Sequence, residues 1–221
     1  MNNNKSFNPV FPSVLSTNFF DLENKLIDFS EAGIDFIHLD VMDGNFVTNI
    51  SFGPSMLKAI KSKFPFMIDA HLMVDNPKEV IPWFIDAGAD WISFHIETKD
   101  NIAENIKMIK SSGIKAGIAL NPDTDIEQII PFINEVDYIL FMSVFPGYGG
   151  QKFMRDVLNK IIELNKIIVR TDISPIIQID GGVNSDNIAK IRDVGVQSYV
   201  VGTYLYNSSN ISKTINELRG A

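Results

Sequence analysis

Short apolar runs, rich in β-branched and aromatic residues, recur along the whole chain and alternate with segments of helical periodicity. Runs such as 138–142 (YILFM) are apolar throughout, as is typical of parallel strands buried on both faces. In the intervening segments apolar residues recur every three or four positions, as on one face of an amphipathic helix. The predicted strands are 9–15, 35–41, 66–73, 90–95, 115–120, 137–143, 175–180 and 197–202. The predicted helices are 21–32, 54–63, 78–87, 101–112, 125–134, 151–169 and 186–194, with a final one after Ser208.

This alternation of strand and helix predicts one α/β domain. Glycines such as Gly33 and Gly88 follow predicted helices, where a left-handed backbone commonly ends the helix. Eight strand–helix units in 221 residues predict a single (β/α)8 TIM barrel over residues 8–221, after a polar, flexible tail at 1–7. The alternative is an open, doubly wound sheet, but the turn after the first strand lacks the glycines typical of that fold.

Composition excludes several functions. The formal net charge is −8 and no Lys/Arg cluster occurs, so nucleic acid is not an expected partner. The sequence has no apolar run of about 18 residues, and its N-terminus lacks the apolar core of a secretion signal, so we expect no membrane partner. Cysteine is absent, which excludes disulfides and thiolate ligands and fits a cytoplasmic protein. Because the overall charge repels anions, an anionic substrate would need local donors such as backbone N–H groups, helix N-termini or a metal.

Polar residues gather at the carboxyl ends of the predicted strands, where TIM barrels carry their active sites. His38 and Asp40 are two residues apart on one strand, so their side chains share a face. His71 and Asp180 lie near the ends of two other strands, and the third histidine, His95, also ends a strand. Any one of these could be a rim or helix-capping residue. Together, two imidazoles and two carboxylates could hold one divalent ion of zinc, manganese or iron.

Glycine-rich turns follow the last three predicted strands. Such turns direct backbone N–H groups toward an anion, and loops in these positions commonly bind phosphate in TIM barrels. The residues concerned are Gly147, Gly149, Gly150, Gly181, Gly182, Gly202 and Thr203. Met42, Met73 and Met142 also lie near strand ends, where they could fill the core or form a thioether lid over a reacting carbon.

Several short motifs follow one another in a fixed order. The segments are 12–16 (PSVLS), 38–44 (HLDVMDG), 46–54 (FVTNISFGP), 71–74 (HLMV), 117–122 (GIALNP), 142–144 (MSV), 146–153 (PGYGGQKF) and 180–183 (DGGV). Their order and spacing closely resemble those of the ribulose-phosphate 3-epimerases, from about Asn8 to the C-terminus.

This resemblance implies a homo-oligomeric enzyme that interconverts D-ribulose 5-phosphate and D-xylulose 5-phosphate in the pentose phosphate pathway. It implies that the metal is held by His38, Asp40, His71 and Asp180. Asp40 and Asp180 would be the acid/base pair, one ionised and one protonated, on either side of a planar enediolate that the metal stabilises. The residues implied to contact substrate are Ser13, His71, Gly147, Tyr148, Gly149, Gly150, Gly181, Gly182, Gly202 and Thr203.

Four positions depart from the usual pattern of that family: Asn45, Thr48, Phe145 and Thr203. None is an implied metal ligand or acid, so the reaction type is unaffected. Phe145 and Thr203 flank the phosphate end, and the related allulose-6-phosphate 3-epimerases also carry Gly-Thr at the last strand. D-allulose 6-phosphate is therefore the first alternative substrate. A phosphate-binding barrel lyase is less favoured because no lysine ends a predicted strand, and a non-catalytic sugar-phosphate binder would not need both acids.

Overall fold

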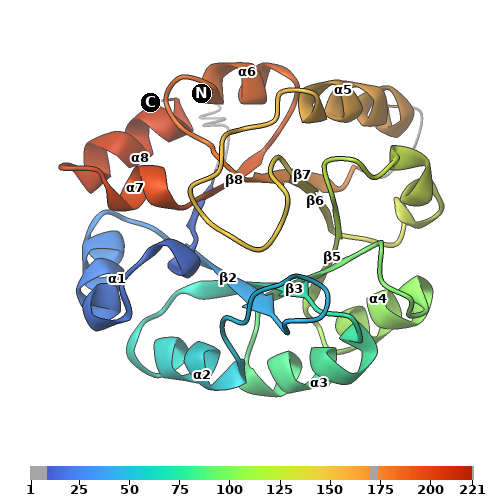
Figure 1. Ribbon diagram of the computed structural model, residues 1–221, viewed down its shortest axis with the longest axis horizontal. Helices are drawn as coiled ribbons and strands as arrows, with labels where there is room; N and C mark the ends of the chain where they lie inside the picture. The colour runs from blue at the N-terminus through green and yellow to red at the C-terminus, as the bar shows by residue number, and fades with distance from the viewer. Residues whose placement is uncertain (1–8, 170–173, 221) are drawn as a thin grey trace, which may run out of the picture.

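Parallel strands form a barrel at the centre of the molecule, and helices surround it (Figure 1). The computed structural model describes residues 9–169 and 174–220, so the predicted tail at 1–7 lies outside the described residues. The strands pair in the order β1-β8-β7-β6-β5-β4-β3-β2, and a parallel bridge between Ser13 and His38 joins the two ends of this order. The predicted single-domain TIM barrel is confirmed. The strands are β1 (Val10–Pro12), β2 (Phe36–Met42), β3 (Met67–Met73), β4 (Trp91–His95), β5 (Lys115–Leu120), β6 (Tyr138–Met142), β7 (Ile176–Asp180) and β8 (Ser198–Val201).

The α-helices lie outside the barrel and pack their apolar faces on the strands. Gly88 ends α3 in the left-handed region at φ +93°, and its N–H donates to the carbonyl of Ile85, as the sequence predicted. No helix in the described ranges is both long and apolar enough to cross a membrane. The helices are α1 (Leu22–Glu31), α2 (Pro54–Lys63), α3 (Pro77–Ala87), α4 (Ile102–Ser111), α5 (Val157–Ile168), α6 (Ile188–Asp193), α7 (Thr203–Tyr206) and α8 (Ile211–Arg219).

The helix predicted at 125–134 is wrong. This segment forms two short 3-10 helices, η3 (Ile126–Gln128) and η4 (Ile130–Phe132). Pro131 has no N–H to donate, which disfavours an α-helical hydrogen-bond ladder in this segment, although α3 accommodates Pro82 in its interior.

Two other predicted elements are shorter in the structure. The helix predicted at 151–169 begins only at Val157, and the residues before it form a loop that packs against Gly182, where an added Cβ would lie 2.7 Å from the nitrogen of Phe153. The strand predicted at 9–15 ends at Pro12. The chain then turns into the 3-10 helix η1 (Val14–Ser16), and η2 (Phe19–Asp21) follows before α1.

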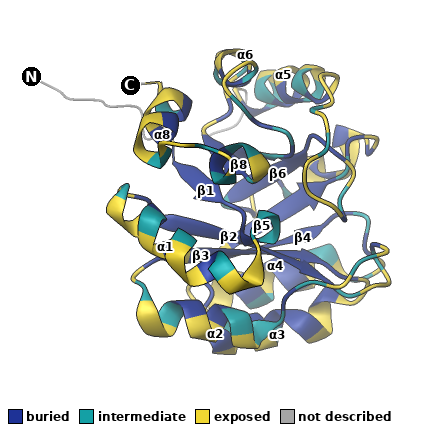
Figure 2. Cartoon of the chain, turned by 60° about the vertical axis from the view of Figure 1, so that its left-hand side comes forward, coloured by how far each residue is buried: buried dark blue, intermediate teal, exposed yellow. Residues whose placement is uncertain are grey.

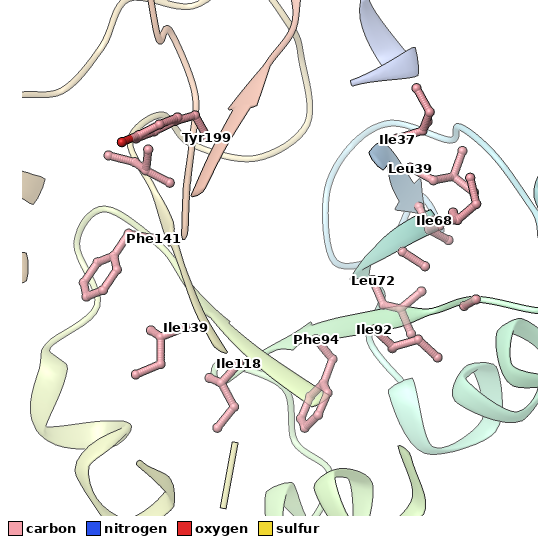
Figure 3. Close-up of a cluster of buried hydrophobic side chains, with 14 of the residues drawn as sticks. Ile37, Leu39, Ile68, Leu72, Ile92, Phe94, Ile118, Ile139, Phe141 and Tyr199 are labelled. Carbon is pink, nitrogen blue, oxygen red and sulfur yellow. The ribbon is translucent and has the colours of Figure 1, made fainter. Parts of the chain in front are cut away.

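Side chains alternate between two buried layers. On β2 and β3, Ile37, Leu39, Ile68 and Leu72 point outward into the apolar layer between the sheet and the helices (Figure 3). Because side chains on a strand alternate with a period of two, His38 and Asp40, which alternate with Ile37 and Leu39 on β2, point into the barrel. Figure 2 shows the same arrangement, with buried strands inside and helices whose outer faces are exposed.

Aromatic rings fill the end of the barrel from which the strands start. The rings of Phe11 and Phe36 stack with their centroids 4.4 Å apart, Phe36 meets Trp91 at 5.6 Å, and Trp91 meets Tyr138 at 4.8 Å. All four side chains are buried and belong to one cluster, which is separate from the outer layer. These four rings form the floor of the barrel interior. The polar side chains of the interior lie at the opposite end, where the strands finish.

Gly117 of β5 pairs with Tyr138, and an added Cβ would lie 2.3 Å from Cζ of that ring. We expect Gly117→Ala to displace the ring and lower the free energy of unfolding by about 1–3 kcal/mol, the usual cost of overpacking, measured by urea denaturation. The control is Gly53→Ser at the N-cap of α2, where no described atom lies within 4 Å of the new Cβ; it should leave stability unchanged or slightly higher. Equal denaturation midpoints for Gly117→Ala and the wild type would contradict the packing described for the floor.

Candidate active site

Four of the predicted site residues meet inside the carboxyl end of the barrel. His38 and Asp40 come from β2, His71 from β3 and Asp180 from β7, and one ligand atom from each lies within 4.8 Å of the others. Asp40 Oδ1 lies 3.4 Å from His38 Nε2 and 3.3 Å from His71 Nδ1, and Asp180 Oδ2 lies 3.9 Å from His38 Nε2. Both histidines are fully buried, while the Asp180 side chain is 15% exposed and faces the mouth. The strands therefore bring together the four residues that the sequence singled out.

A buried carboxylate orients His38. Asp69 Oδ2 lies 2.9 Å from His38 Nδ1, and because a carboxylate only accepts hydrogen bonds, Nδ1 is the protonated nitrogen. Asp69 also accepts hydrogen bonds from the Tyr138 hydroxyl at 2.8 Å and from Gln178 Nε2 at 3.1 Å. The other nitrogen of His38, Nε2, is buried and has no hydrogen-bond partner among the described residues. This orphaned atom fits a cation ligand, since metal-binding histidines commonly donate their second N–H to a carboxylate.

The sequence analysis missed Asp69. Its signal was present in the spacing, because Asp69 and His71 repeat on β3 the two-residue step of His38 and Asp40 on β2. The register then pairs His38 with Asp69 and Asp40 with His71, so each histidine faces a carboxylate on the neighbouring strand.

The two carboxyl groups at the site differ sharply in acidity. Burial opposes the ionisation of Asp40, but the neighbouring His38 and His71 hold its pKa well below the ordinary value. The hydroxyl of Ser13 also donates to Asp40 Oδ2 at 2.6 Å. Burial, and then the negative charge of Asp40, raise the pKa of Asp180 to about 7. Near neutral pH the protein groups alone therefore favour an ionised Asp40 beside a protonated Asp180.

The two histidines also differ. Burial lowers the pKa of His71 to about 4, so this imidazole is neutral near pH 7 and can offer a lone pair. Burial works against a charge on His38 as well, but Asp40 and Asp69 raise its pKa well above the ordinary value. A positive charge is thus favoured next to Asp40 and Asp69, as a proton on His38 or as a cation in its place.

A cavity of about 380 Å³ opens above these groups. It contains every predicted site residue except His38 and His71, which lie buried behind Asp40. The three methionines line its walls and are at most 4% exposed, so they are fixed on strands β2, β3 and β6; their action as a lid stays a prediction. The predicted residues that line the cavity are Ser13, Asp40, Met42, Met73, Met142, Gly147, Tyr148, Gly149, Gly150, Asp180, Gly181, Gly182, Gly202 and Thr203.

The glycine loops form one side of this cavity, and the long loop after β6 crosses the mouth of the barrel (Figure 1). Gly147 and Gly181 have φ of +126° and +119°, which only glycine adopts readily. A Cβ on Gly181 would lie 2.6 Å from Val144, and one on Gly202 would lie 2.3 Å from the hydroxyl oxygen of Ser16. Glycine at these positions lets the three loops approach each other closely.

Tyr148 lines the cavity and also joins two loops at its mouth. It is 58% exposed, and its hydroxyl donates to the carbonyl of Thr48 at 2.9 Å. Asn49 Nδ2 donates to the carbonyl of Gly147 at 2.7 Å. Tyr148 therefore ties the loop after β6 to the loop after β2, and its contact with substrate stays a prediction.

Two cations that the sequence analysis did not select, Lys152 and Arg155, also line the cavity. Both follow the glycines of the loop after β6 and lie before α5 begins at Val157. Their nearness to the predicted phosphate loops was visible in the sequence, but the predicted helix from residue 151 would have placed them on a helical surface.

Comparisons with known proteins identify the family of the chain. A sequence profile of the ribulose-phosphate 3 epimerase family matches residues 9–206. The ribulose-phosphate 3-epimerase of Bacillus subtilis (strain 168) is 39% identical over 213 residues, which cover 96% of this chain and 98% of that protein. The chloroplastic ribulose-5-phosphate-3-epimerase of Arabidopsis thaliana is 38% identical over 214 residues, or 96% of this chain and 76% of that protein.

Solved structures share the fold at low sequence identity. The 3-hexulose-6-phosphate synthase from Salmonella typhimurium has a TM-score of 0.70 and 16% identity, covering 96% of this chain and 97% of that chain. A tryptophan synthase alpha-subunit from Pyrococcus furiosus has a TM-score of 0.70 and 14% identity, covering 98% and 99%. These likenesses support the barrel alone. The profile match and the identity to named relatives establish that the chain belongs to the ribulose-phosphate 3-epimerase family.

Proposed function

We propose that this chain interconverts D-ribulose 5-phosphate and D-xylulose 5-phosphate by inverting the configuration at C3. The chain is an enzyme of the ribulose-phosphate 3-epimerase family, and its named relatives support an epimerase activity. The observation that carries the mechanism is the pair Asp40 and Asp180, two carboxyl groups with opposite preferred charge that line one cavity.

Inversion next to a ketone requires a proton to leave one face of C3 and another to arrive on the opposite face. In the proposed mechanism ionised Asp40 takes the first proton and protonated Asp180 delivers the second. The two groups end the step with their charges exchanged, so the reverse reaction starts from the opposite state. Their strands, β2 and β7, are three steps apart around the barrel, so the carboxyl groups approach the substrate from different sides.

His38, Asp40, His71 and Asp180 would hold one divalent ion, and two nitrogen and two oxygen ligands fit zinc, manganese or iron. When bound, such an ion acts as a Lewis acid that stabilises the negative charge of an enediolate. The support from this chain is the orphaned Nε2 of His38, which the contact of Nδ1 with Asp69 aims at the other ligands. Ser13 and Asp69 would keep Asp40 and His38 in place while protons move.

The substrate phosphate would bind at the glycine loops. Backbone N–H groups of residues 147–150, 181–182 and 202 would surround it, with the hydroxyl of Thr203 beside them. Thr203 Oγ1 lies 3.8 Å from where a Cβ on Gly150 would be, so it borders that loop. Lys152 and Arg155 add the positive charge that a protein of net charge −8 needs to attract a phosphate. A fixed phosphate would orient C3 between the two acids.

D-allulose 6-phosphate is the alternative substrate of the same reaction. Thr203 lines the cavity beside the glycine loops, where a sugar longer by one carbon would differ from a pentulose, whereas Phe145 is 47% exposed and does not line the cavity. The lyase alternative stays less favoured because Lys152, the lysine that lines the cavity, comes from a loop rather than a strand end. A cytoplasmic location and a homo-oligomer, both expected from the sequence, complete the proposal.

We expect turnover of D-ribulose 5-phosphate in deuterated water to place deuterium at C3 of the product, because each inversion exchanges the proton through an acid of the enzyme. Mass spectrometry or proton NMR measures the incorporation. The same preparation is assayed for kcat/KM on D-ribulose 5-phosphate and D-allulose 6-phosphate, with metal content determined. Retention of the original C3 hydrogen would rule out the two-acid mechanism, and a higher kcat/KM for the hexulose would replace the pentulose as substrate.

Asp180→Asn should reduce kcat by at least about 10²-fold, the low end of general acid–base contributions, because the amide cannot exchange a proton with C3. Steady-state kinetics measure this loss. The matched control is Asp193→Asn at the exposed end of α6, which should retain normal kcat. Near-normal turnover of Asp180→Asn would remove Asp180 from the acid/base pair.

The raised pKa of Asp180 also predicts a pH-dependent stability. The folded protein holds this proton up to about pH 7, whereas the unfolded chain releases it near the ordinary value of 3.8, so ionisation lowers the free energy of unfolding as the pH rises between them. With a chelator present, Asp180→Asn should lose this contribution, which amounts to up to about 2 kcal/mol between roughly pH 4.5 and pH 6.

Urea denaturation at both pH values measures that difference. Exposed Asp123 provides the control variant Asp123→Asn, which should keep the pH dependence of the wild type. The same pH dependence in Asp180→Asn and the wild type would mean that the Asp180 carboxyl is not held protonated in the fold.

A further inference from the structure

The third histidine, His95, belongs to the site without reaching the cavity. It ends β4, is fully buried, and does not line the cavity. Its Nε2 lies 2.9 Å from Nε2 of His71, and the two rings are 5.0 Å apart. The ring of Phe46 covers it, with centroids 4.7 Å apart. His95 can therefore act on the reaction only through His71.

Glu97 fixes the other side of His95. Glu97 Oε2 lies 2.9 Å from His95 Nδ1, while Oε1 accepts the backbone N–H of Asn121 at 2.7 Å and the hydroxyl of Thr124. Burial opposes ionisation of Glu97, but these contacts, led by His95, lower its pKa below the ordinary value. Glu97 is therefore a carboxylate whose position is set by the end of β5.

The direction of each hydrogen bond follows from this carboxylate. Because Glu97 only accepts, His95 Nδ1 donates to it, which leaves the lone pair of His95 on Nε2. The facing nitrogen of His71, Nε2, must then carry a proton and donate to that lone pair. This places the lone pair of His71 on Nδ1, 3.3 Å from Asp40 Oδ1, so that the nitrogen and the carboxylate oxygen face each other as two ligands of one cation would. Without a cation, His71 Nδ1 could instead donate to Asp40, but His95 would then have to carry protons on both nitrogens.

We propose that His95 and Glu97 are positioning residues that fix the tautomer of His71, so that its Nδ1 faces the metal position as a lone pair. The proposal rests on the metal site of the proposed function. Asp69 fixes the tautomer of His38 in the same way, by accepting a hydrogen bond from Nδ1. His38 therefore presents Nε2, and His71 presents Nδ1, to the same point between Asp40 and Asp180. Orienting partners of this kind commonly change metal affinity about 10–100-fold.

The tautomer can be measured directly, because the chain has only three histidines. In Zn²⁺-loaded protein labelled with ¹⁵N-histidine, long-range proton–nitrogen correlation spectra at one fixed pH distinguish ring nitrogens that carry a proton from those that do not. We expect His71 to be protonated on Nε2 and bare on Nδ1, and His95 to be protonated on Nδ1 alone. A protonated Nδ1 on His71, or two protonated nitrogens on His95, would overturn the proposal without any variant being made.

Glu97→Gln tests the same chain of hydrogen bonds by reversing it. The amide oxygen can still accept from Asn121 and Thr124, which turns the NH₂ group toward His95 Nδ1. His95 would then protonate Nε2 and donate to His71, moving the proton of His71 onto Nδ1. We expect the variant to bind Zn²⁺ about 10–100-fold more weakly in competition with a chromophoric chelator, while the metal-free melting temperature changes little because each donor keeps an acceptor.

Thr98→Val is the matched control. The Thr98 hydroxyl donates to the backbone carbonyl of His95 at 3.0 Å, so the variant loses a buried hydrogen bond beside His95 but leaves the donors of both rings unchanged. Its Zn²⁺ affinity should equal that of the wild type. Equal affinity of Glu97→Gln and the wild type would overturn the positioning role. If the wild-type protein bound no Zn²⁺, the metal site of the proposed function would fail, while spectra of the metal-free protein would still show whether His95 carries its proton on Nδ1, facing Glu97.

Discussion

The register between β2 and β3 is the constraint on which the site depends. It pairs His38 with Asp69 and Asp40 with His71, so that each buried imidazole meets a carboxylate on the neighbouring strand. A slip of either strand by one residue would turn its two polar side chains toward the apolar layer beneath the helices. The apolar residues that alternate with them, such as Leu39, pack in the outer layer and oppose such a slip. Burial of ordinary hydrophobic side chains thus fixes the positions of the polar ones.

Burying so many ionisable groups has an energetic consequence that also suits the chemistry. Asp40 and Asp180 cannot both be charged easily in this environment, so one carboxyl becomes a stronger acid and the other a weaker one. Asp69, which lies below them, is fully buried and accepts three hydrogen bonds, one of them from His38. A positive ion at the ligand position would relieve the repulsion among these carboxylates, which explains why the donor set fits a divalent cation.

The loops around the mouth combine close approach with few side chains. Glycines after β6, β7 and β8 leave the backbone free to face a ligand, while Tyr148 and Asn49 tie the loop after β6 to the one after β2. The named relatives match the chain at 38–39% identity over almost its whole length, and the solved barrels at 14–16% identity share the fold. The barrel is therefore a general support, and the specific chemistry lies in residues at the carboxyl ends of its strands.

The sequence by itself determined the alternation of strands and helices, the single barrel, the glycine loops and the four residues that converge on one point. These features depend on local patterns: hydrophobic periodicity, helix-ending glycines, and polar residues at the ends of apolar runs. The local pattern wrongly predicted an α-helix at 125–134, where the chain forms two 3-10 helices around Pro131. It also failed where a loop packs on a distant glycine, as before α5.

Only the tertiary structure decided what surrounds the four residues. Asp69 meets Tyr138 and Gln178 across 69 and 109 positions of the chain, and His95 meets His71 across 24. Such contacts depend on strand register and barrel closure, which no spacing along one strand reveals. The acidity of Asp40 and Asp180 has the same origin, since a pKa depends on burial and on the charges nearby in space. The sequence identified Asp40 and Asp180 as the candidate acids, but only their surroundings in the fold lower the pKa of Asp40 and raise that of Asp180.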